Sequence, residues 1–252
     1  MSLEQSPAVV LRVFPWSETS LVATLYSREF GKLSVLAKGA RRPKSPFEAA
    51  LDLLSICRVV FVSKSADALD ILTEAKLERR FRGADHGLLR LYCGYYVSEL
   101  VDRLTDKGEK QPEVYDLVTE SLDRLQTLEA DPGAVTLRLE LGMLRLLGHL
   151  PSWQQCAQCG VNVEEEQGVI FGVNYGGVLC ERCRQGARNL MRISSGARKT
   201  LEEFSREDWR NVNLDAVPDT FRKAVRAVLR RYLESLLDRK FQLHEYLEEL
   251  GR

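Results

Sequence analysis

Four of the six cysteines fall into two close pairs, and side chains paired in this way can bind a metal ion. Cys156 and Cys159 form the first pair and Cys180 and Cys183 the second, each with two residues between its cysteines. The pairs are 20 residues apart, which matches the zinc-ribbon spacing. Four thiolates fill the tetrahedral shell of Zn²⁺ and leave no position for water or substrate. The spacing therefore predicts one structural zinc ion and argues against a catalytic one.

Other uses of the cysteines fit the sequence less well. A redox dithiol needs a thioredoxin-like setting and does not explain two pairs. Disulfides are disfavoured because no export signal precedes the cysteines. His149 ends a predicted helix and is expected to cap it rather than to bind the metal. Cys57 and Cys93 stand alone among apolar residues and are predicted to be buried.

A basic stretch between residues 28 and 45 is the second candidate site. Its cations are Arg28, Lys32, Lys38, Arg41, Arg42 and Lys44. A predicted strand ends at Lys38, and Pro43 stiffens the loop that follows, so that the last four cations can reach phosphates. A merely solvated loop is the alternative. Because Lys plus Arg and Asp plus Glu both number 36, only such a local patch can attract DNA.

A predicted helix from Pro218 to about Arg239 carries a third candidate surface. Its apolar stripe consists of Phe221, Val225, Val228, Leu229, Tyr232, Leu236 and Leu237. Beside the stripe, Arg222, Arg226 and Arg230 recur at every fourth residue. These arginines are a possible second anion or partner surface, and a solvated helix face is the alternative.

The sequence contains no recognisable catalytic motif. Residues 39–45 resemble a phosphate-binding P-loop, but Lys44 stands one position too early. No G-x-G-x-x-G follows a predicted strand, no H-E-x-x-H occurs, and the three histidines are scattered. We therefore expect a protein that is not an enzyme.

Five short apolar runs before residue 80 predict β-strands. They are residues 8–14, 19–27, 31–39, 56–63 and 69–77. In the third run Leu33, Val35 and Ala37 alternate with polar residues, which gives one buried and one wet face. Five short strands in this length of chain suit a small closed barrel such as the OB fold.

Helical periodicity replaces this pattern after about residue 80. One helix is predicted to end before Asp106, a second to begin at Pro112, and a third to run from Asp131 to near Gly148. The fold class is therefore α+β and multidomain: an N-terminal OB-fold barrel, then an α-helical domain with an inserted four-cysteine zinc finger. The predicted regions are 1–80 (barrel), 81–150 (first helical part), 151–190 (finger) and 191–252 (second helical part).

No apolar run is long enough to cross a membrane, and no signal peptide pattern opens the chain. We therefore expect a soluble protein that is not exported and has no membrane partner. The apolar share of 44% allows the chain to bury a core.

Several of these motifs together resemble the RecO recombination-mediator family, over nearly the whole chain. They are TLYS followed by GKLSVLAKGARRPKS, LELGMLRLLGHLPSWQQCAQCG, FGVNYGGVLCERC and ISSGA. Three of them are the most specific: the K-G-A-R-R-x-x-S turn, the L-G-x-x-P before the first cysteine pair and the G-G-x-L-C-x-x-C that closes the finger.

The resemblance implies a function without nucleotide hydrolysis. Members of the family bind single- and double-stranded DNA and anneal complementary strands. They work with RecR to help RecA replace the single-stranded-DNA-binding protein, whose acidic C-terminal tail is a further expected partner. The resemblance thus implies a cytoplasmic, nucleoid-associated protein. The alternative is an RNA-binding or protein-interaction module that only shares an OB-plus-zinc-ribbon architecture, and a strand-annealing assay would distinguish the two.

Overall fold

The structure is a computed structural model, and it describes most of the chain. The described residues are 2–45, 47, 50–64, 68–164, 168–211, 217–238, 241 and 243. The chain divides into two compact units, with the boundary between Thr136 and Leu137. This boundary lies inside the third helix. Each unit is described separately.

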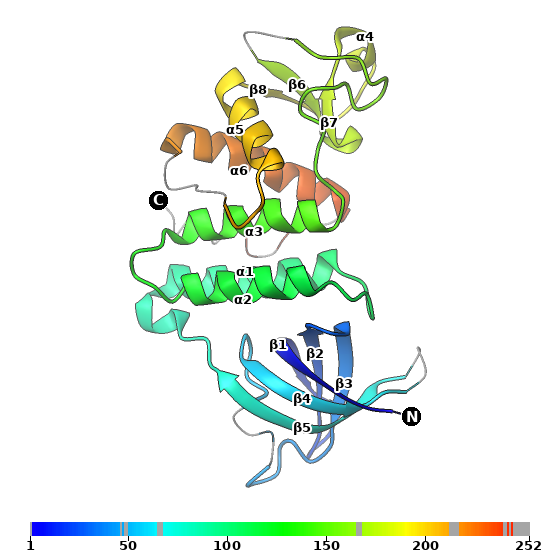
Figure 1. The fold of residues 1–252 in the computed structure, drawn as a ribbon, viewed down its shortest axis with the longest axis vertical. Coiled ribbons are helices and arrows are strands. Elements are labelled where there is room, and N and C mark those ends of the chain that lie inside the picture. Colours follow the sequence, from blue (N-terminus) through cyan, green and yellow to red (C-terminus); the bar gives the residue numbers. More distant parts are fainter. Residues whose placement is uncertain are drawn as a thin grey trace. The chain divides into compact units, whose positions relative to one another are not determined.

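The first unit begins with a closed barrel of five strands (Figure 1). The strands are β1 (Leu3–Pro15), β2 (Leu21–Ser27), β3 (Gly31–Ala37), β4 (Ile56–Val62) and β5 (Asp70–Arg79). Their order is β1-β2-β3-β5-β4, with β1 also paired to β4 and a parallel pairing between β3 and β5. This confirms the predicted OB-fold barrel, although β1 starts five residues earlier than its apolar pattern suggested.

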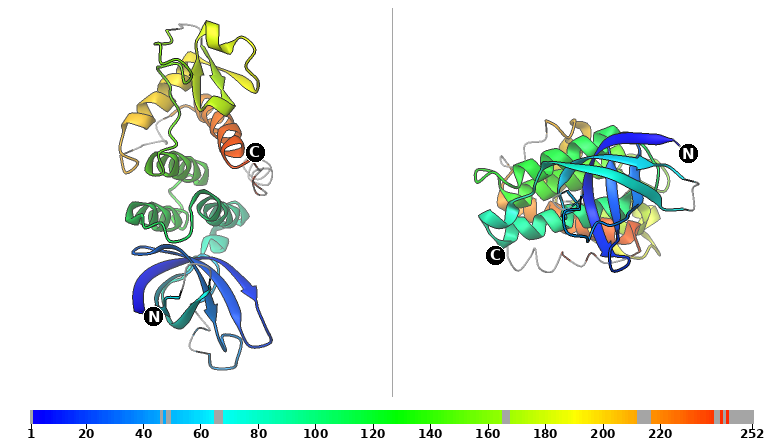
Figure 2. Two further views of the ribbon diagram at one scale, coloured as in Figure 1. Left: turned by 90° about the vertical axis from the view of Figure 1, so that its right-hand side faces the viewer. Right: turned by 90° about the horizontal axis from the view of Figure 1, so that it is seen from below.

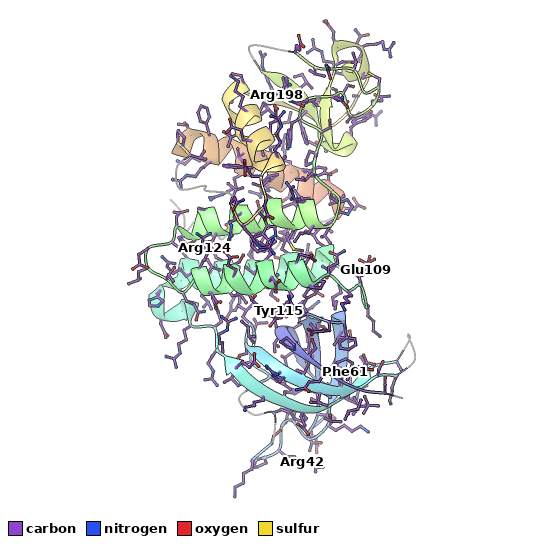
Figure 3. All side chains as sticks on the ribbon, in the orientation of Figure 1. Arg42, Phe61, Glu109, Tyr115, Arg124 and Arg198 are labelled. Carbon is purple, nitrogen blue, oxygen red and sulfur yellow. The ribbon has the colours of Figure 1, made fainter. Side chains whose placement is uncertain are left out.

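The barrel core follows the alternation that the sequence shows. Leu33, Val35 and Ala37 of β3 point into the core, together with Phe61 of β4, whose ring meets Phe30 edge-on with ring centroids 5.3 Å apart. Figure 3 shows Phe61 inside the barrel. Cys57 belongs to the same core and is fully buried, as predicted.

A β-bulge between Val10 and Arg12 changes which residues of β1 face the core. Val10 points inward before the bulge and Val13 packs against the core after it. The extra residue shifts the alternation by one position. Arg12 and Phe14 therefore lie on the outside of the barrel.

Two helices, α1 (Leu88–Leu104) and α2 (Pro112–Arg124), follow a short 3₁₀ turn, η1 (Gly83–His86). They lie side by side and pack against β1 and β2 (Figures 1 and 2). Pro112 occupies the first turn of α2 as predicted, where its missing N–H costs no hydrogen bond. Arg90 of α1 is buried, and it donates to the carbonyl oxygens of Leu125, Leu128 and Ala130 at 2.8–3.2 Å.

The third helix, α3 (Pro132–Leu146), starts as its sequence predicts. The Asp131 carboxylate accepts a hydrogen bond from the backbone N–H of Ala134 at 2.6 Å, which caps the first turn. Gly148 has a φ of 75°, and the His149 N–H donates to the carbonyl oxygen of Leu144 at 2.7 Å. This pairing ends the helix in the manner of a glycine C-cap.

The second unit contains a three-stranded sheet and the last helices. Its elements are β6 (Val169–Gly172), η2 (Val173–Tyr175), β7 (Gly177–Leu179), α4 (Glu181–Arg184), β8 (Leu190–Ile193), α5 (Ser195–Arg206) and α6 (Asp219–Leu236). The strands are ordered β7-β6-β8, and α5 packs against α6.

The last helix, α6, is slightly shorter than predicted. It ends at Leu236, and Asp238 adopts a left-handed φ of 49°; the predicted end at Arg239 lies outside the described residues. Most of the predicted apolar stripe is buried, and Leu233, which the pattern analysis missed, is buried with it. Phe221, Leu236 and Leu237 are only half-buried. None of the described helices is both long and apolar enough to span a membrane.

Candidate metal centre and nucleic-acid interface

The first cysteine pair lies on a tight turn. The Cys156 N–H donates to the carbonyl oxygen of Val161, and the Gly160 N–H donates to that of Cys156, both at 2.8 Å. Gly160 has a φ of 74°, which favours glycine because it has no Cβ. The turn presents Cys156 and Cys159 on one side.

The second pair is placed by the start of a short helix. Cys180 is the residue before α4 and Cys183 lies within it. The N–H of Arg184 donates to the carbonyl oxygen of Cys180 at 3.0 Å, which closes the turn between the two cysteines. Each pair is therefore shaped by its own backbone hydrogen bonds.

Backbone contacts between the segments bring the two pairs together. The Ser152 carbonyl accepts from the Val178 N–H at 2.9 Å, and the Ala157 N–H donates to the Val178 carbonyl at 2.9 Å. A Cβ on Gly177 would come within 2.8 Å of the Ser152 carbonyl oxygen and 3.0 Å of the Ala157 Cβ. Only glycine permits this close approach, so Gly177 helps to set the register between the cysteine pairs.

The four sulfur atoms lie close enough together to share one metal ion. All four lie within 4.8 Å of one another, and the Cys159 and Cys180 sulfurs are 3.7 Å apart. A tetrahedron with metal–sulfur bonds of about 2.3 Å has sulfur atoms about 3.8 Å apart. These residues can therefore hold a metal ion. His149 is not part of the cluster.

The electrostatics of the cluster also favour a bound cation. Burial raises the pKa of the Cys156 thiol, but backbone hydrogen bonds from Cys180, Cys159 and Gln158 outweigh it and bring that pKa to about 6. Burial and the neighbouring thiols raise the pKa of Cys183 to about 12. Four thiolates this close repel one another, so full ionisation needs a nearby cation. A divalent metal would supply that charge.

The base of this finger is held by α5. The guanidinium of Arg198 donates to the carbonyl oxygen of Trp153 at 2.9 Å and to that of Val163 at 2.8 Å. Trp153 stacks on Phe171 of β6 with ring centroids 5.2 Å apart. Figure 3 shows Arg198 at the junction between α5 and the finger. The sequence analysis did not single out this arginine.

The basic loop after β3 lies at one end of the barrel. Lys38, Arg41, Arg42 and Lys44 are all exposed, and Arg42 extends away from α1 and α2 (Figure 3). Arg41 is tied to the loop between β1 and β2, because its N–H donates to the Thr19 carbonyl and its guanidinium to that of Ser17, both at 3.0 Å. The loop thus presents clustered cations on a fixed backbone.

A hollow of about 480 Å³ adjoins this loop. Its lining residues are Leu21, Ala40, Arg41, Arg42, Pro43, Phe47 and Leu51. The lining combines apolar side chains with two arginines and so offers both apolar and anion contacts.

The structure separates the other two predicted cations from this loop. Arg28 forms an ion pair with Asp116 of α2, with nitrogen–oxygen distances of 3.0 and 3.2 Å, and this partner raises the pKa of Arg28. Lys32 donates to the carbonyl oxygen of Asp102 at 2.6 Å and lies 3.6 Å from its carboxylate. Both side chains thus bind groups of the same unit.

The arginines of α6 do form one stripe, but they are all half-buried. Arg230 is engaged with the carboxylate of Glu234 at 3.2 Å, one helical turn on. The charge of this stripe is therefore partly neutralised within the helix, in contrast to the exposed cations of the barrel loop.

A closed OB barrel, a helical region and a four-cysteine site that can hold a metal ion together define a multidomain OB-fold protein. Sequence comparisons narrow this class. Residues 1–81 match the family model described as "Recombination protein O N terminal", and residues 86–244 match that described as "Recombination protein O C terminal". The chain belongs to the RecO family of DNA repair proteins, and it is not an enzyme.

Individual relatives agree with this family. The chain is 42% identical over 201 residues to "DNA repair protein RecO" of Rhodopirellula baltica, covering 79% of this chain and 74% of the relative. It is 30% identical over 251 residues to "DNA repair protein RecO" of Symbiobacterium thermophilum, covering 99% and 98%. The resemblance inferred from the motifs is confirmed.

Proposed function

We propose that this protein binds single- and double-stranded DNA, anneals complementary strands and, with RecR, assists RecA loading onto DNA coated by the single-stranded-DNA-binding protein. The exposed basic loop of the barrel carries the proposal. Lys38, Arg41, Arg42 and Lys44 concentrate positive charge on a chain whose formal net charge is zero. A polyanion binds such a chain only where charge is locally concentrated.

The proposed contacts are mainly to phosphates. Arg42 and Lys44 are exposed cations on a loop rather than a helix inserted into a groove. Contacts of this kind position a protein on DNA but carry little sequence information. We therefore expect weak sequence preference and strong salt dependence.

The Arg42→Ala/Lys44→Ala double variant tests this assignment. It removes two exposed charges and leaves the Arg41 hydrogen bonds that hold the loop in place. The slope of log affinity against log salt should flatten by up to about 1.8 for duplex DNA and about 1.4 for single strands. Annealing of fluorescent complementary oligonucleotides should slow in parallel.

A matched control uses the exposed cations Lys64 and Lys76, which lie elsewhere on the barrel. Lys64→Ala/Lys76→Ala changes the net charge by the same amount but should leave the slope unchanged. If the loop variant and the wild type have equal salt slopes, the loop is not part of the DNA-binding site. Unaltered annealing in the loop variant would favour a protein-interaction module instead.

The proposed cofactor is one structural Zn²⁺ bound by Cys156, Cys159, Cys180 and Cys183. The sulfur spacing supports it, and a closed four-thiolate shell offers no open position for substrate. The proposed regions of the chain are 1–80, 81–150, 151–190 and 191–252, and the proposed location is the cytoplasm, at the nucleoid.

We propose the α6 stripe as a second surface, for the acidic C-terminal tail of the single-stranded-DNA-binding protein. Arg222, Arg226 and Arg230 lie beside apolar residues, and an acidic tail ending in hydrophobic residues needs both surface types. Arg226→Ala should weaken binding of the tail peptide, whereas Lys223→Ala, an exposed cation of the same helix, should not. If Arg226→Ala binds the tail peptide as tightly as the wild type does, the α6 stripe does not bind this tail.

A further inference from the structure

Two large aromatic side chains are exposed where β1 ends. Phe14 is 46% exposed and Trp16 is 65% exposed, whereas the other two tryptophans, Trp153 and Trp209, are each 4% exposed. All three tryptophans lie in the described part of the chain. Exposed aromatic groups placed together are characteristic of binding surfaces. The phosphate contacts proposed above make no use of them.

The bulge in β1 is what turns Phe14 outward, and cross-strand pairing gives it apolar neighbours. Phe14 pairs with Val22 of β2, and Val22 pairs with Leu36 of β3. Residues in register across antiparallel strands point to the same face. Phe14, Val22 and Leu36 therefore form one row on the outside of the barrel, which we call the outer row, and Val22 and Leu36 are only half-buried.

Another row on the same face of the barrel already contacts the helices of the first unit. Val9 and Tyr26 are in register and buried, in the part of β1 and β2 against which α1 and α2 pack. Lys32, the next residue in that row, is bound to Asp102. The outer row lies beyond this contact and keeps its aromatic member exposed.

Arg12 holds the Phe14 ring in place. Its guanidinium lies 4.8 Å from the ring centroid and forms an ion pair with Asp102 at 3.1 Å. A cation over the ring face restricts how the side chain can turn. Phe14 is therefore held for contact on its remaining surface.

The exposed tryptophan is joined to the basic loop through backbone contacts. The Trp16 N–H donates to the Ser20 carbonyl at 3.0 Å, which closes the turn that carries the indole. Arg41 binds the Ser17 and Thr19 carbonyls of the same turn. The turn that carries Trp16 and the basic loop are thus held together by hydrogen bonds.

We infer that Phe14 and Trp16 stack on the bases of single-stranded nucleic acid while the basic loop holds its phosphates. This inference rests on the proposed function of that loop. Unpaired strands expose both base faces and phosphates, whereas a duplex hides its base faces in the stack. Aromatic platforms beside cationic grooves bind single strands in this way. The positive charge beside the platform favours this occupant over an uncharged protein surface.

The fluorescence of Trp16 can report binding, because Trp16 is the exposed one of the three tryptophans. Single-stranded oligonucleotide should quench its fluorescence, and an oligonucleotide with abasic residues, which keeps the phosphates, should quench it far less. Phe14→Ala/Trp16→Ala removes two stacking side chains and should lose about 30-fold or more in affinity for the normal strand. Its affinity for the abasic strand and its salt slope should stay close to those of the wild type.

Two further variants separate stacking from general effects. Trp16→Phe keeps an aromatic face and should recover most of the affinity that Trp16→Leu loses. Leu3→Ala, which removes an exposed apolar side chain from the other end of β1, should bind like the wild type. Circular dichroism of each variant checks that the barrel is folded.

The outcomes distinguish this inference from the proposed function. If Arg42→Ala/Lys44→Ala weakens binding but the aromatic variants bind the normal strand like the wild type, the stacking surface is refuted and the phosphate loop stands. Equal losses for normal and abasic strands in Phe14→Ala/Trp16→Ala would also refute stacking. If the aromatic variants lose an acidic peptide but no oligonucleotide, the surface belongs to a protein partner.

Discussion

The cysteine cluster and the basic loop of the barrel meet opposite physical demands. In the cluster, backbone hydrogen bonds hold the cysteines so that their four sulfur atoms lie close to one another. In the loop, Arg42 and Lys44 face solvent on a backbone that Arg41 holds in place. The first arrangement suits a permanently bound ion, and the second suits contact that forms and breaks.

This difference shows why the two sites respond differently to substitution. Metal binding to a closed shell is coupled to folding, so the loss of one ligand removes most of the stabilisation at once. Phosphate contacts on an exposed loop add up one by one and weaken with salt. Changes in the finger should therefore alter structure, and changes in the loop should alter only affinity.

The largest effect is expected from Cys159→Ser. Metal analysis should find about one zinc per wild-type chain and far less in the variant, because the binding of a structural zinc is worth about 10–16 kcal/mol. Limited proteolysis should then cut within residues 151–190. Cys93→Ala, which alters a buried cysteine outside the cluster, should keep its zinc. A fully folded Cys159→Ser protein that had lost only annealing would contradict a structural role for the metal.

A smaller effect on the same region is expected from Gly177→Ala. The new Cβ would lie 2.8 Å from the Ser152 carbonyl oxygen, so the backbone that aligns the cysteine pairs must shift, at a cost of about 1–3 kcal/mol. Zinc release to a chelator should become faster. Gly108→Ala, at a positive φ with open space around it, is the control and should leave release unchanged. The same release rate in both variants would show that Gly177 does not set the register.

The smallest effect is expected from Arg28→Ala. Its ion pair with Asp116 is solvent-exposed, so the free energy of unfolding, measured with urea, should fall only slightly. The salt slope of DNA binding should not change, because the guanidinium is already bound to a carboxylate. A slope flattened by about 0.9, as in a loop variant, would extend the DNA site to the β2–β3 turn.

Local patterns in the sequence account for much of this protein. Leu33, Val35 and Ala37 alternate as a strand of the barrel must, and Asp131 caps α3 as its position predicts. The C-x-x-C spacing predicts the cysteine cluster because each turn is built from neighbouring residues. Such features depend on residues a few positions apart, so they can be predicted directly from the sequence.

Longer-range features could not be predicted in this way. Arg28 and Lys32 look like members of the basic loop, but their partners, Asp116 and Asp102, lie 88 and 70 residues further along the chain. The β1 bulge has no clear sequence signal, yet it decides that Phe14 faces outward. Charge alone does not reveal which cations have a partner.

The sequence by itself determined the barrel strands, the helix starts and the four cysteines, because hydrophobic period, capping and ligand spacing are local properties. Only the tertiary structure decided which cations remain exposed and which aromatic residues face solvent. Those outcomes depend on which distant segments pack together: Asp102 and Asp116 neutralise one end of the basic stretch, while Arg42 and Lys44 stay in water.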